Sequence, residues 1–251
     1  MTTMLRTTDT AHRHALADVL DGVGTVLGVW AHPDDETYLS GGLMAALADA
    51  GRTVALVTAT YGERGAPPGT DDLEAVAALR RAELRTALDT LGVVHQTWIG
   101  FPDGGCAAAD NEAAIGALVT MLRLVRPDTV LTFPPDGLTG HPDHMAVSRW
   151  TTEAFRRAAP AGARLWYAAT TPERYDEFAA VEAQLEVHLA GTPALTERDA
   201  LALQLELPDD LLDCKVAALA AHHSQTAPLF EAMGPELFRA WVRTEEFVAA
   251  A

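Results

Sequence analysis

The sequence has few cysteines, few basic residues and no long hydrophobic run, and each shortage removes a class of protein. Cys106 and Cys214 lie far apart and form no CxxC motif, which excludes a disulfide scaffold and a cysteine-only zinc knuckle. The 18 Lys and Arg residues are outnumbered by 35 Asp and Glu residues, giving a formal net charge of −17. Such a chain, lacking a basic patch, would repel nucleic acids and anionic membranes, so neither is predicted as a partner.

Signals for membranes and secretion are also missing. No apolar run approaches the roughly eighteen residues that a membrane-spanning helix needs. Charged side chains and histidines interrupt residues 1–20, so no secretory signal is predicted and a cytoplasmic protein is expected. With 251 residues, 49% of them hydrophobic, the chain is expected to form a single domain over 1–251, with 1–20 as an N-terminal extension or helix. A homo-oligomer is compatible with the sequence but not indicated by it.

Neither common nucleotide-binding fingerprint is present. Gly22, Gly24 and Gly28 lie before and within the first hydrophobic run, and their spacing is not GxGxxG. The GxxxxGK[ST] pattern is absent as well.

Short β-rich runs alternate with longer helical patterns. Strands are predicted at residues 25–31, 53–60, 93–99, 129–133, 163–169 and 201–207, and helices at 38–50, 71–91, 112–125, 143–159 and 211–223. This order predicts an α/β fold, a Rossmann-like three-layer sandwich with a mostly parallel central sheet. Long loops at 61–70, 100–110 and 134–140 each follow a strand, so the active site is expected at the carboxyl edge of the sheet.

Two short motifs follow predicted strands at that edge. AHPDDE occupies residues 31–36 and GHPDH occupies residues 140–144. Clustered carboxylates repel one another unless a cation compensates. His32 and Asp35, with one histidine of the second motif, would supply the mixed nitrogen and oxygen ligands of a catalytic zinc site. The adjacent carboxylate of Asp34 can then accept a proton from the attacking water as a general base.

These motifs resemble those of the LmbE-like (PIG-L) family of zinc-dependent N-acetylglucosaminyl deacetylases. Other segments resemble the family pattern over most of the chain: YGERG at 61–65, RRAE at 80–83, LGV at 91–93, GFPDG at 100–104, and Lys215 with HHSQ at 222–225. The resemblance implies removal of an acetyl group from the amide nitrogen of an N-acetylglucosamine-type sugar or glycoconjugate, with one Zn²⁺ per chain. Such ligands also accept Fe²⁺ or another divalent metal.

The resemblance implies roles for individual residues. The metal ligands are His32, Asp35 and His144. The catalytic residues are Asp34, as general base, and His141, which stabilises the tetrahedral intermediate. Some members carry a tyrosine two residues before the first histidine of the second motif, where this sequence has Thr139.

Five further side chains are candidates for supporting or substrate-binding roles: Glu36, Asp143, Arg64, Asp103 and His222. Asp143 matches an acidic residue thought to orient a motif histidine. Glu36 fits backbone donors better than the metal. Arg64 is either a surface cation or a substrate contact, and Asp103 either contacts sugar hydroxyls or caps a turn. His222 is either part of a pocket wall or a packed core imidazole.

Two other functions compete with the deacetylase prediction. One is an amidase that cleaves a thiol conjugate or another non-sugar amide with the same residues. The other is a metal-binding module that has lost catalysis. Asp34 argues against the second, because a non-catalytic descendant has no need of a carboxylate that binds no metal.

Overall fold

The computed structural model describes residues 19–66 and 70–250 of the chain. Residues 19–23 are helical, and the rest of the predicted N-terminal extension, residues 1–18, lies outside the described residues. Residues 67–69 of the first predicted loop also lie outside them.

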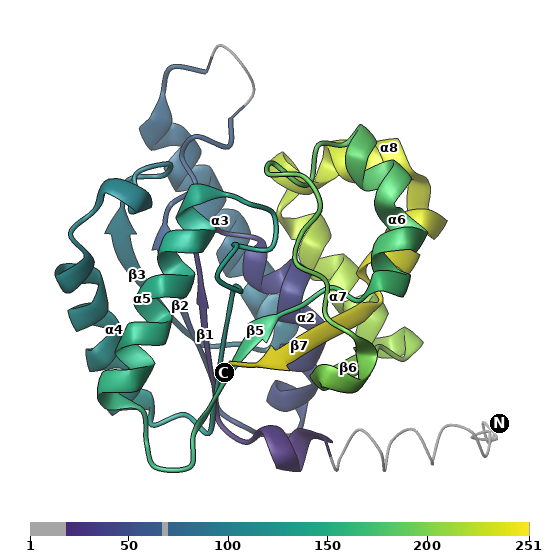
Figure 1. The fold of residues 1–251 in the computed structure, drawn as a ribbon. Helices are drawn as coiled ribbons and strands as arrows, with labels where there is room; N and C mark the ends of the chain where they lie inside the picture. Colours follow the sequence, from purple (N-terminus) through teal and green to yellow (C-terminus); the bar gives the residue numbers. More distant parts are fainter. Residues whose placement is uncertain (1–18, 67–69, 251) are drawn as a thin grey trace, which may run out of the picture.

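Seven strands form one sheet in the order β3-β2-β1-β4-β5-β7-β6 (Figure 1). Their bounds are Val26–Trp30 (β1), Val54–Thr60 (β2), His95–Phe101 (β3), Thr129–Thr132 (β4), Arg164–Ala168 (β5), Leu201–Glu206 (β6) and Thr244–Ala249 (β7). The first five strands in this order pair in parallel, whereas β7 runs antiparallel to both of its neighbours. The predicted mostly parallel sheet is therefore confirmed.

Burial explains where the strands form. Every residue of β1, β2 and β4 is buried, as expected of central strands covered by helices on both faces. β3 lies at the edge of the sheet and contains only exposed and half-buried residues. Its weaker hydrophobic pattern placed the predicted strand, 93–99, two residues too early.

Helices on both faces of the sheet confirm the predicted three-layer sandwich. Their bounds are Asp35–Asp49 (α2), Leu73–Leu91 (α3), Asn111–Val125 (α4), Pro142–Ala158 (α5), Pro172–Gln184 (α6), Asp209–Ala221 (α7) and His223–Val242 (α8). α2, α3 and α7 pack against one another, and α4 and α5 form a second pair. α6 and α8 lie near each other at the β7 side of the sheet (Figure 1).

Acidic side chains lie at the starts of two helices. The side chain of Asp72 caps α3 by accepting a backbone N–H of the first turn. Pro208 precedes α7, and Asp209 and Asp210 lie inside its first turn. Carboxylates there still interact favourably with the helix dipole.

Three elements were not predicted. α6 begins with a Thr171 cap and Pro172 at its first position, a recognisable start signal. α8 contains two prolines and a kink at Gly234, which break the helical pattern. β7 carries two adjacent glutamates, Glu245 and Glu246, both buried, which hide its strand character.

The order of the strands reverses between β1 and β4. From β1 the chain proceeds outward through β2 to β3, and it then returns to β4 on the other side of β1. The carboxyl ends of β1 and β4 therefore meet at the switch point, where open α/β sheets bind ligands. Both motifs follow these two strands.

One ion pair lies wholly inside the molecule. Lys215 is the only lysine in the sequence, and its Nζ is 2.8 Å from Glu245 Oε1, with both side chains 0% exposed. Glu245 also accepts the backbone N–H groups of Gly42 and Leu43. The pair thus joins α7, β7 and α2, and removing either partner would leave a buried charge unpaired.

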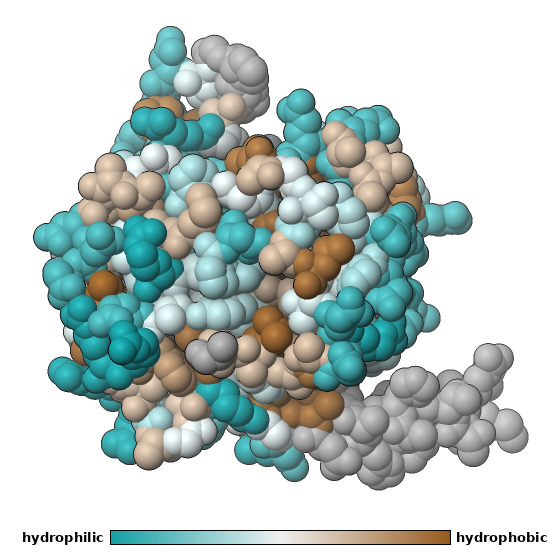
Figure 2. Space-filling model, in the orientation of Figure 1, coloured by the Kyte–Doolittle hydropathy of each residue, from teal (hydrophilic) through white to brown (hydrophobic). Residues whose placement is uncertain are grey.

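The surface carries no large apolar field on the face shown in Figure 2, where apolar side chains form small separate spots among hydrophilic ones. Scattered apolar side chains of this kind are normal on soluble proteins. Within residues 19–66 and 70–250, no helix combines the length and the apolar character needed to cross a bilayer.

Candidate metal centre

The site begins at the turn between β1 and α2. The backbone N–H of His32 donates to Asp35 Oδ2 at 2.7 Å, and α2 starts at Asp35, three residues earlier than predicted. Asp34 adopts a φ of 123°, in a region that non-glycine residues rarely occupy. The two adjacent carboxylates consequently reach different partners. Asp35 contacts the motif histidines, and Asp34 contacts Arg80.

The second motif forms the start of α5. His141 is the N-cap, and its Nδ1 accepts the backbone N–H of Asp143 at 3.1 Å. Pro142 occupies the first turn, where its missing N–H is not needed. His144 lies in the same turn and is buried.

Four potential ligand atoms, from three side chains, lie close together. His32 Nδ1 lies 3.2 Å from His144 Nε2 and 3.5 Å from Asp35 Oδ2, and His144 Nε2 lies 3.4 Å from Asp35 Oδ1. Zinc–ligand bonds of about 2.0–2.2 Å in tetrahedral geometry place neighbouring ligand atoms about 3.3–3.6 Å apart. The three side chains therefore fit a mononuclear divalent metal ion with little adjustment.

Hydrogen bonds determine which nitrogen is free in each of the two candidate ligand histidines, His32 and His144. His32 Nε2 lies 3.1 Å from Asp103 Oδ1 and 3.4 Å from Asp143 Oδ2, so it carries the proton and leaves Nδ1 for a metal. His144 Nδ1 lies 3.1 Å from the carbonyl oxygen of Gly137, which can only accept. Its Nε2 lone pair is therefore free. Metal-binding histidines are commonly oriented in this way by carboxylates and carbonyls.

The electrostatics of the site favour a cation between these groups. Burial opposes a charge on His32, yet its hydrogen bonds to Asp103, Asp143 and Asp35 outweigh burial and raise its pKa. Burial lowers the pKa of His144 to about 4, which keeps its ring neutral and able to bind a metal at neutral pH. Asp35 is ionised there, because its two histidine partners offset burial and lower its pKa.

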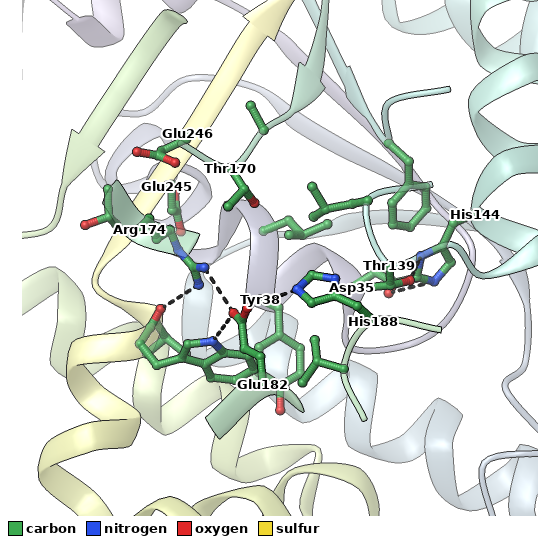
Figure 3. A pocket seen from close by; sticks show the side chains of 18 of the residues that line it. Asp35, Tyr38, Thr139, His144, Thr170, Arg174, Glu182, His188, Glu245 and Glu246 are labelled. Atoms are coloured by element: carbon green, nitrogen blue, oxygen red, sulfur yellow. Dashed lines mark hydrogen bonds and ion pairs between the residues drawn. The ribbon is translucent and has the colours of Figure 1, made fainter. Parts of the chain in front are cut away.

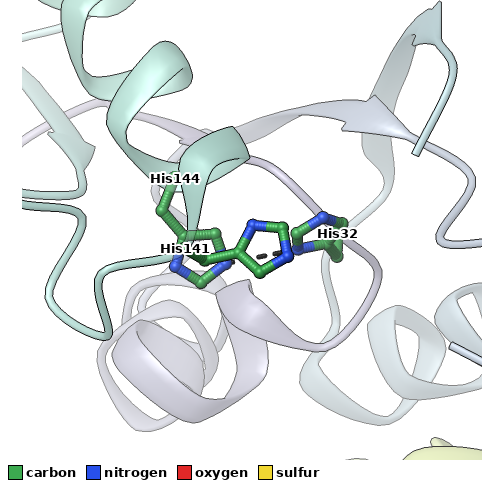
Figure 4. Close-up of side chains that lie close together, drawn as sticks. All are labelled: His32, His141 and His144. Atoms are coloured by element: carbon green, nitrogen blue, oxygen red, sulfur yellow. Dashed lines mark hydrogen bonds between the residues drawn. The ribbon is translucent and has the colours of Figure 1, made fainter. Parts of the chain in front are cut away.

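His141 lies beside the three ligand side chains. The ring nitrogens of His32, His141 and His144 fall within 4.8 Å of one another, which gives an alternative three-imidazole set (Figure 4). The carboxylate of Asp35 faces both rings, with Oδ1 3.4 Å from His144 Nε2 and Oδ2 3.5 Å from His32 Nδ1, so we favour Asp35 as the third ligand. Because Nδ1 of His141 accepts a backbone N–H, its proton lies on Nε2, where it can be donated to a bound molecule.

A second group combines His32 with Asp103 and Asp143, all three buried. Both carboxylates already accept protein donors. Asp143 accepts the N–H groups of Gly104 at 2.7 Å and Cys106 at 3.0 Å. We therefore assign this group to the support of His32 and not to a second metal site.

Asp34 is held by a buried arginine. Arg80 Nη2 lies 3.0 Å from Asp34 Oδ2 and donates to the carbonyl of Pro33 at 2.6 Å, while Nη1 donates to the carbonyl of Gly62 at 2.8 Å. Gly62 has a φ of +67°, and a Cβ there would meet the guanidinium. Burial raises the pKa of Asp34 to about 6 even though Arg80 pulls it down.

Glu36 and His222 lie behind the Asp34 turn. Glu36 Oε2 accepts the backbone N–H of Asp34 at 3.1 Å, and its Oε1 lies 3.2 Å from His222 Nε2. His222 is fully buried at the junction of α7 and α8, and it does not line the cavity described below. Glu36 thus meets a backbone donor, and His222 is a packed imidazole.

Arg64 and Asp103 tie two loops together. The backbone N–H of Arg64 donates to Asp103 Oδ2 at 2.8 Å, and the N–H of Asp103 donates to Glu63 Oε1 at 2.8 Å. The side chain of Arg64 is exposed, whereas Asp103 is buried against His32. Of the two sequence-based alternatives for Asp103, sugar contact or turn cap, the structure favours neither: its carboxylate supports His32.

We expect Asp103→Asn to weaken metal binding about 10–100-fold, the usual cost of losing a partner of a ligating histidine. The substitution removes the negative charge that faces and stabilises the proton on His32 Nε2. A metal titration with a competing chelator measures the effect, with Asp89→Asn, an exposed aspartate of α3, as control. Unchanged metal affinity with a raised KM would instead place Asp103 on the substrate.

Sequence reasoning missed two contributors. No role for Arg80 is predicted from the sequence, yet it falls on the buried face of α3 with Val76, Ala77 and Glu83, and charges on an apolar helix face are a usable signal. Thr139 stands where some family members have tyrosine, and its Oγ1 lies 3.1 Å from His144 Nδ1. Only the loop geometry reveals that contact.

A cavity of about 330 Å³ opens beside the ligands. In Figure 3, His144, Asp35 and Thr139 lie at one end, and Arg174, Glu245 and Glu246 lie at the other. Its walls come from α2, α6, α8, β7 and the loop after β4.

The structure thus combines an α/β sandwich with a His/Asp/His cluster at its switch point. Residues 27–155 match the family described as PIG-L, GlcNAc-PI de-N-acetylase. A 1D-myo-inositol 2-acetamido-2-deoxy-alpha-D-glucopyranoside deacetylase of Mycobacterium sp. (strain KMS) is 34% identical over 230 residues, covering 81% of this chain and 74% of the relative. The chain therefore belongs to the PIG-L family, as the sequence motifs predicted.

Solved structures share the fold. An N,N'-diacetylchitobiose deacetylase from Pyrococcus horikoshii has a TM-score of 0.63 at 21% identity, covering 99% of this chain and 95% of that one. GalB of Pseudomonas putida KT2440, a 4-carboxy-2-hydroxymuconate hydratase, has a TM-score of 0.60 at 19% identity, covering 91% and 96%. Because a hydratase shares this fold, the fold alone does not define the reaction.

Proposed function

We propose that this protein is a zinc-dependent deacetylase that hydrolyses the N-acetyl amide of an N-acetylglucosamine-type sugar or glycoconjugate. The observation that carries the proposal is the His32–Asp35–His144 cluster with the separate carboxylate of Asp34 beside it, in a chain of the PIG-L family. The name of the mycobacterial relative supports the substrate class.

The residues divide the reaction between them. His32, Asp35 and His144 would hold a divalent metal ion, which would polarise the acetyl carbonyl and lower the pKa of water toward ~7. Asp34, oriented by Arg80, accepts a proton from the attacking water at its carboxylate. His141 donates its Nε2 proton toward the carbonyl oxygen or the departing nitrogen. A C–O bond forms and the C–N bond breaks, which releases acetate and a free amine.

The proposal is tested with metal-loaded protein and N-acetylglucosamine, by measuring free amine and acetate in equal amounts. A chelator should abolish turnover, and added Zn²⁺ should restore it. Restoration by Fe²⁺ alone would change the metal but keep the reaction. Amine release from thiol conjugates or other non-sugar amides only would favour the alternative amidase, and metal binding without any turnover would favour the non-catalytic module. The cytoplasmic location and any homo-oligomer remain predictions.

A further inference from the structure

The cavity beside the metal centre is larger than an acetyl group requires. Its volume is about 330 Å³. An apolar cavity of roughly 150 Å³ is enough to hold a benzene ring, so this one has about twice the space of a site for six carbons. An acetyl methyl would occupy only the end next to the ligands.

The position of the cavity indicates which part of the substrate enters it. Among the described residues, its lining includes Asp34, Asp35 and His144 but not His141 or Arg64. When His141 protonates the departing nitrogen, one of the two roles proposed for it, the amide nitrogen faces His141. The acyl carbon and the nitrogen diverge from the carbonyl carbon by about 120°, the angle of a planar amide. In that orientation the acyl chain extends on the side away from His141, and the cavity, whose lining does not include His141, offers space there.

The walls of the cavity are mostly apolar. Side chains from four segments contribute, namely Leu39, Leu138, Leu185, Val187, Leu229 and Trp241. Tyr38 lies between the two ends of the cavity, and its hydroxyl lies 3.2 Å from Thr226 Oγ1 (Figure 3). Such a wall stabilises a hydrocarbon chain and offers a sugar few hydrogen bonds.

The charged groups at the far end are already paired. Glu182 accepts from Arg174 Nη1 at 3.2 Å and Trp241 Nε1 at 2.8 Å, and its Oε2 lies 2.9 Å from His188 Nε2. The Nδ1 atom of His188 has no hydrogen-bond partner within the described part of the chain, but it is covered too closely for water to reach it. The charges of Glu182 and Arg174 therefore already compensate each other without a charged ligand.

The two buried glutamates at that end are also satisfied. Glu245 pairs with Lys215. Glu246 accepts from the backbone N–H and hydroxyl of Thr171 and from Gln204 Nε2. A neutral occupant consequently leaves no carboxylate in the lining without a partner.

We infer that this cavity is an acyl-chain site, and that the protein hydrolyses N-acyl amides with unbranched chains of about six to eight carbons better than N-acetyl amides. The inference rests on the proposed hydrolase function and extends it to the acyl group. Binding energy from the chain is shared by ground and transition states, so it lowers KM and raises kcat/KM while kcat changes little.

The test compares N-acetyl-, N-butyryl-, N-hexanoyl- and N-octanoylglucosamine with metal-loaded protein. Each methylene that reaches the apolar wall should raise kcat/KM by up to about fourfold. We expect hexanoyl to exceed acetyl at least tenfold, mainly through KM. A steady fall in kcat/KM from acetyl to octanoyl would overturn the inference and leave the deacetylase proposal intact.

A substitution that fills part of the cavity tests whether the acyl chain binds there. Leu229→Trp in α8 should lower the hexanoyl-to-acetyl ratio of kcat/KM at least fivefold, because the larger side chain takes up cavity volume. Leu237→Trp is the matched control: the same exchange on the same helix, at an exposed position outside the lining. An equal effect of both variants, or sensitivity to the sugar substituents and not to the acyl chain, would assign the cavity to something other than the acyl group.

Binding separates this inference from the proposed function. If no amide is hydrolysed, the proposed function fails, and calorimetric titration of the Asp34→Asn protein with the same four amides still tests the site. Tighter binding with chain length, lost in an Asp34→Asn/Leu229→Trp double variant, supports the acyl site. Equal affinities across the series overturn it.

Discussion

Replacing Asp34 with Asn should leave the metal in place and reduce kcat about 10²–10⁴-fold, the usual contribution of a general base. The amide keeps the shape of the carboxylate and can still accept from Arg80, which lies 3.0 Å from Asp34 Oδ2. Asn also tolerates the positive φ of 123° at this position better than most residues. It cannot, however, accept the proton of water.

Two measurements on the Asp34→Asn protein decide the assignment. Elemental analysis reports metal content, and the rate of amine release reports kcat. Asp49→Asn, an exposed aspartate on the same helix α2, controls for the loss of one charge. Joint loss of metal and activity would make Asp34 a ligand, and unchanged kcat would remove it from the mechanism.

Replacing His144 with Ala should remove most of the bound metal. The change deletes one of three converging ligand atoms, Nε2, which lies 3.2 Å from His32 Nδ1 and 3.4 Å from Asp35 Oδ1. Losing a supporting partner of a ligand already costs about 10–100-fold in metal affinity, and losing the ligand itself should cost more. Deacetylation should fall in parallel with metal content.

Two further histidine variants serve as comparisons for His144→Ala. His95→Ala removes an exposed histidine of β3 and should leave metal content unchanged. His141→Ala distinguishes the two candidate ligand sets: it should keep the metal and lower kcat if Asp35 is the third ligand. Full metal occupancy in His144→Ala, with loss in His141→Ala, would reverse their assigned roles.

The core of the site could be predicted because it depends on local sequence and parallel topology. His32 and His144 each follow a buried strand, and two neighbouring parallel strands deliver their carboxyl ends to one edge. The positions of the two motifs in the sequence therefore predict that the potential ligands lie close together. The switch point between β1 and β4 explains why these two loops meet, and not others.

The supporting contacts and the cavity could not be predicted in the same way. Asp103 reaches His32 across 71 residues of sequence, and no periodic pattern encodes that contact. Part of the cavity wall comes from α6, α8 and β7, the three elements that sequence patterns missed. The kink in α8 at Gly234 interrupts the helical pattern, and the buried glutamates of β7 break the strand pattern because they serve tertiary contacts.

The burial of Lys215 has a practical consequence for covalent labelling. The sole lysine side chain of this sequence is 0% exposed and paired with Glu245, so amine-reactive reagents have no ε-amino group to attack while the fold is intact. Acylation of Lys215 requires an opening that breaks the contacts of α7 with β7, and its rate reports the free energy of that opening. The same property keeps the background low when a fluorogenic amine reagent is used to follow the release of glucosamine.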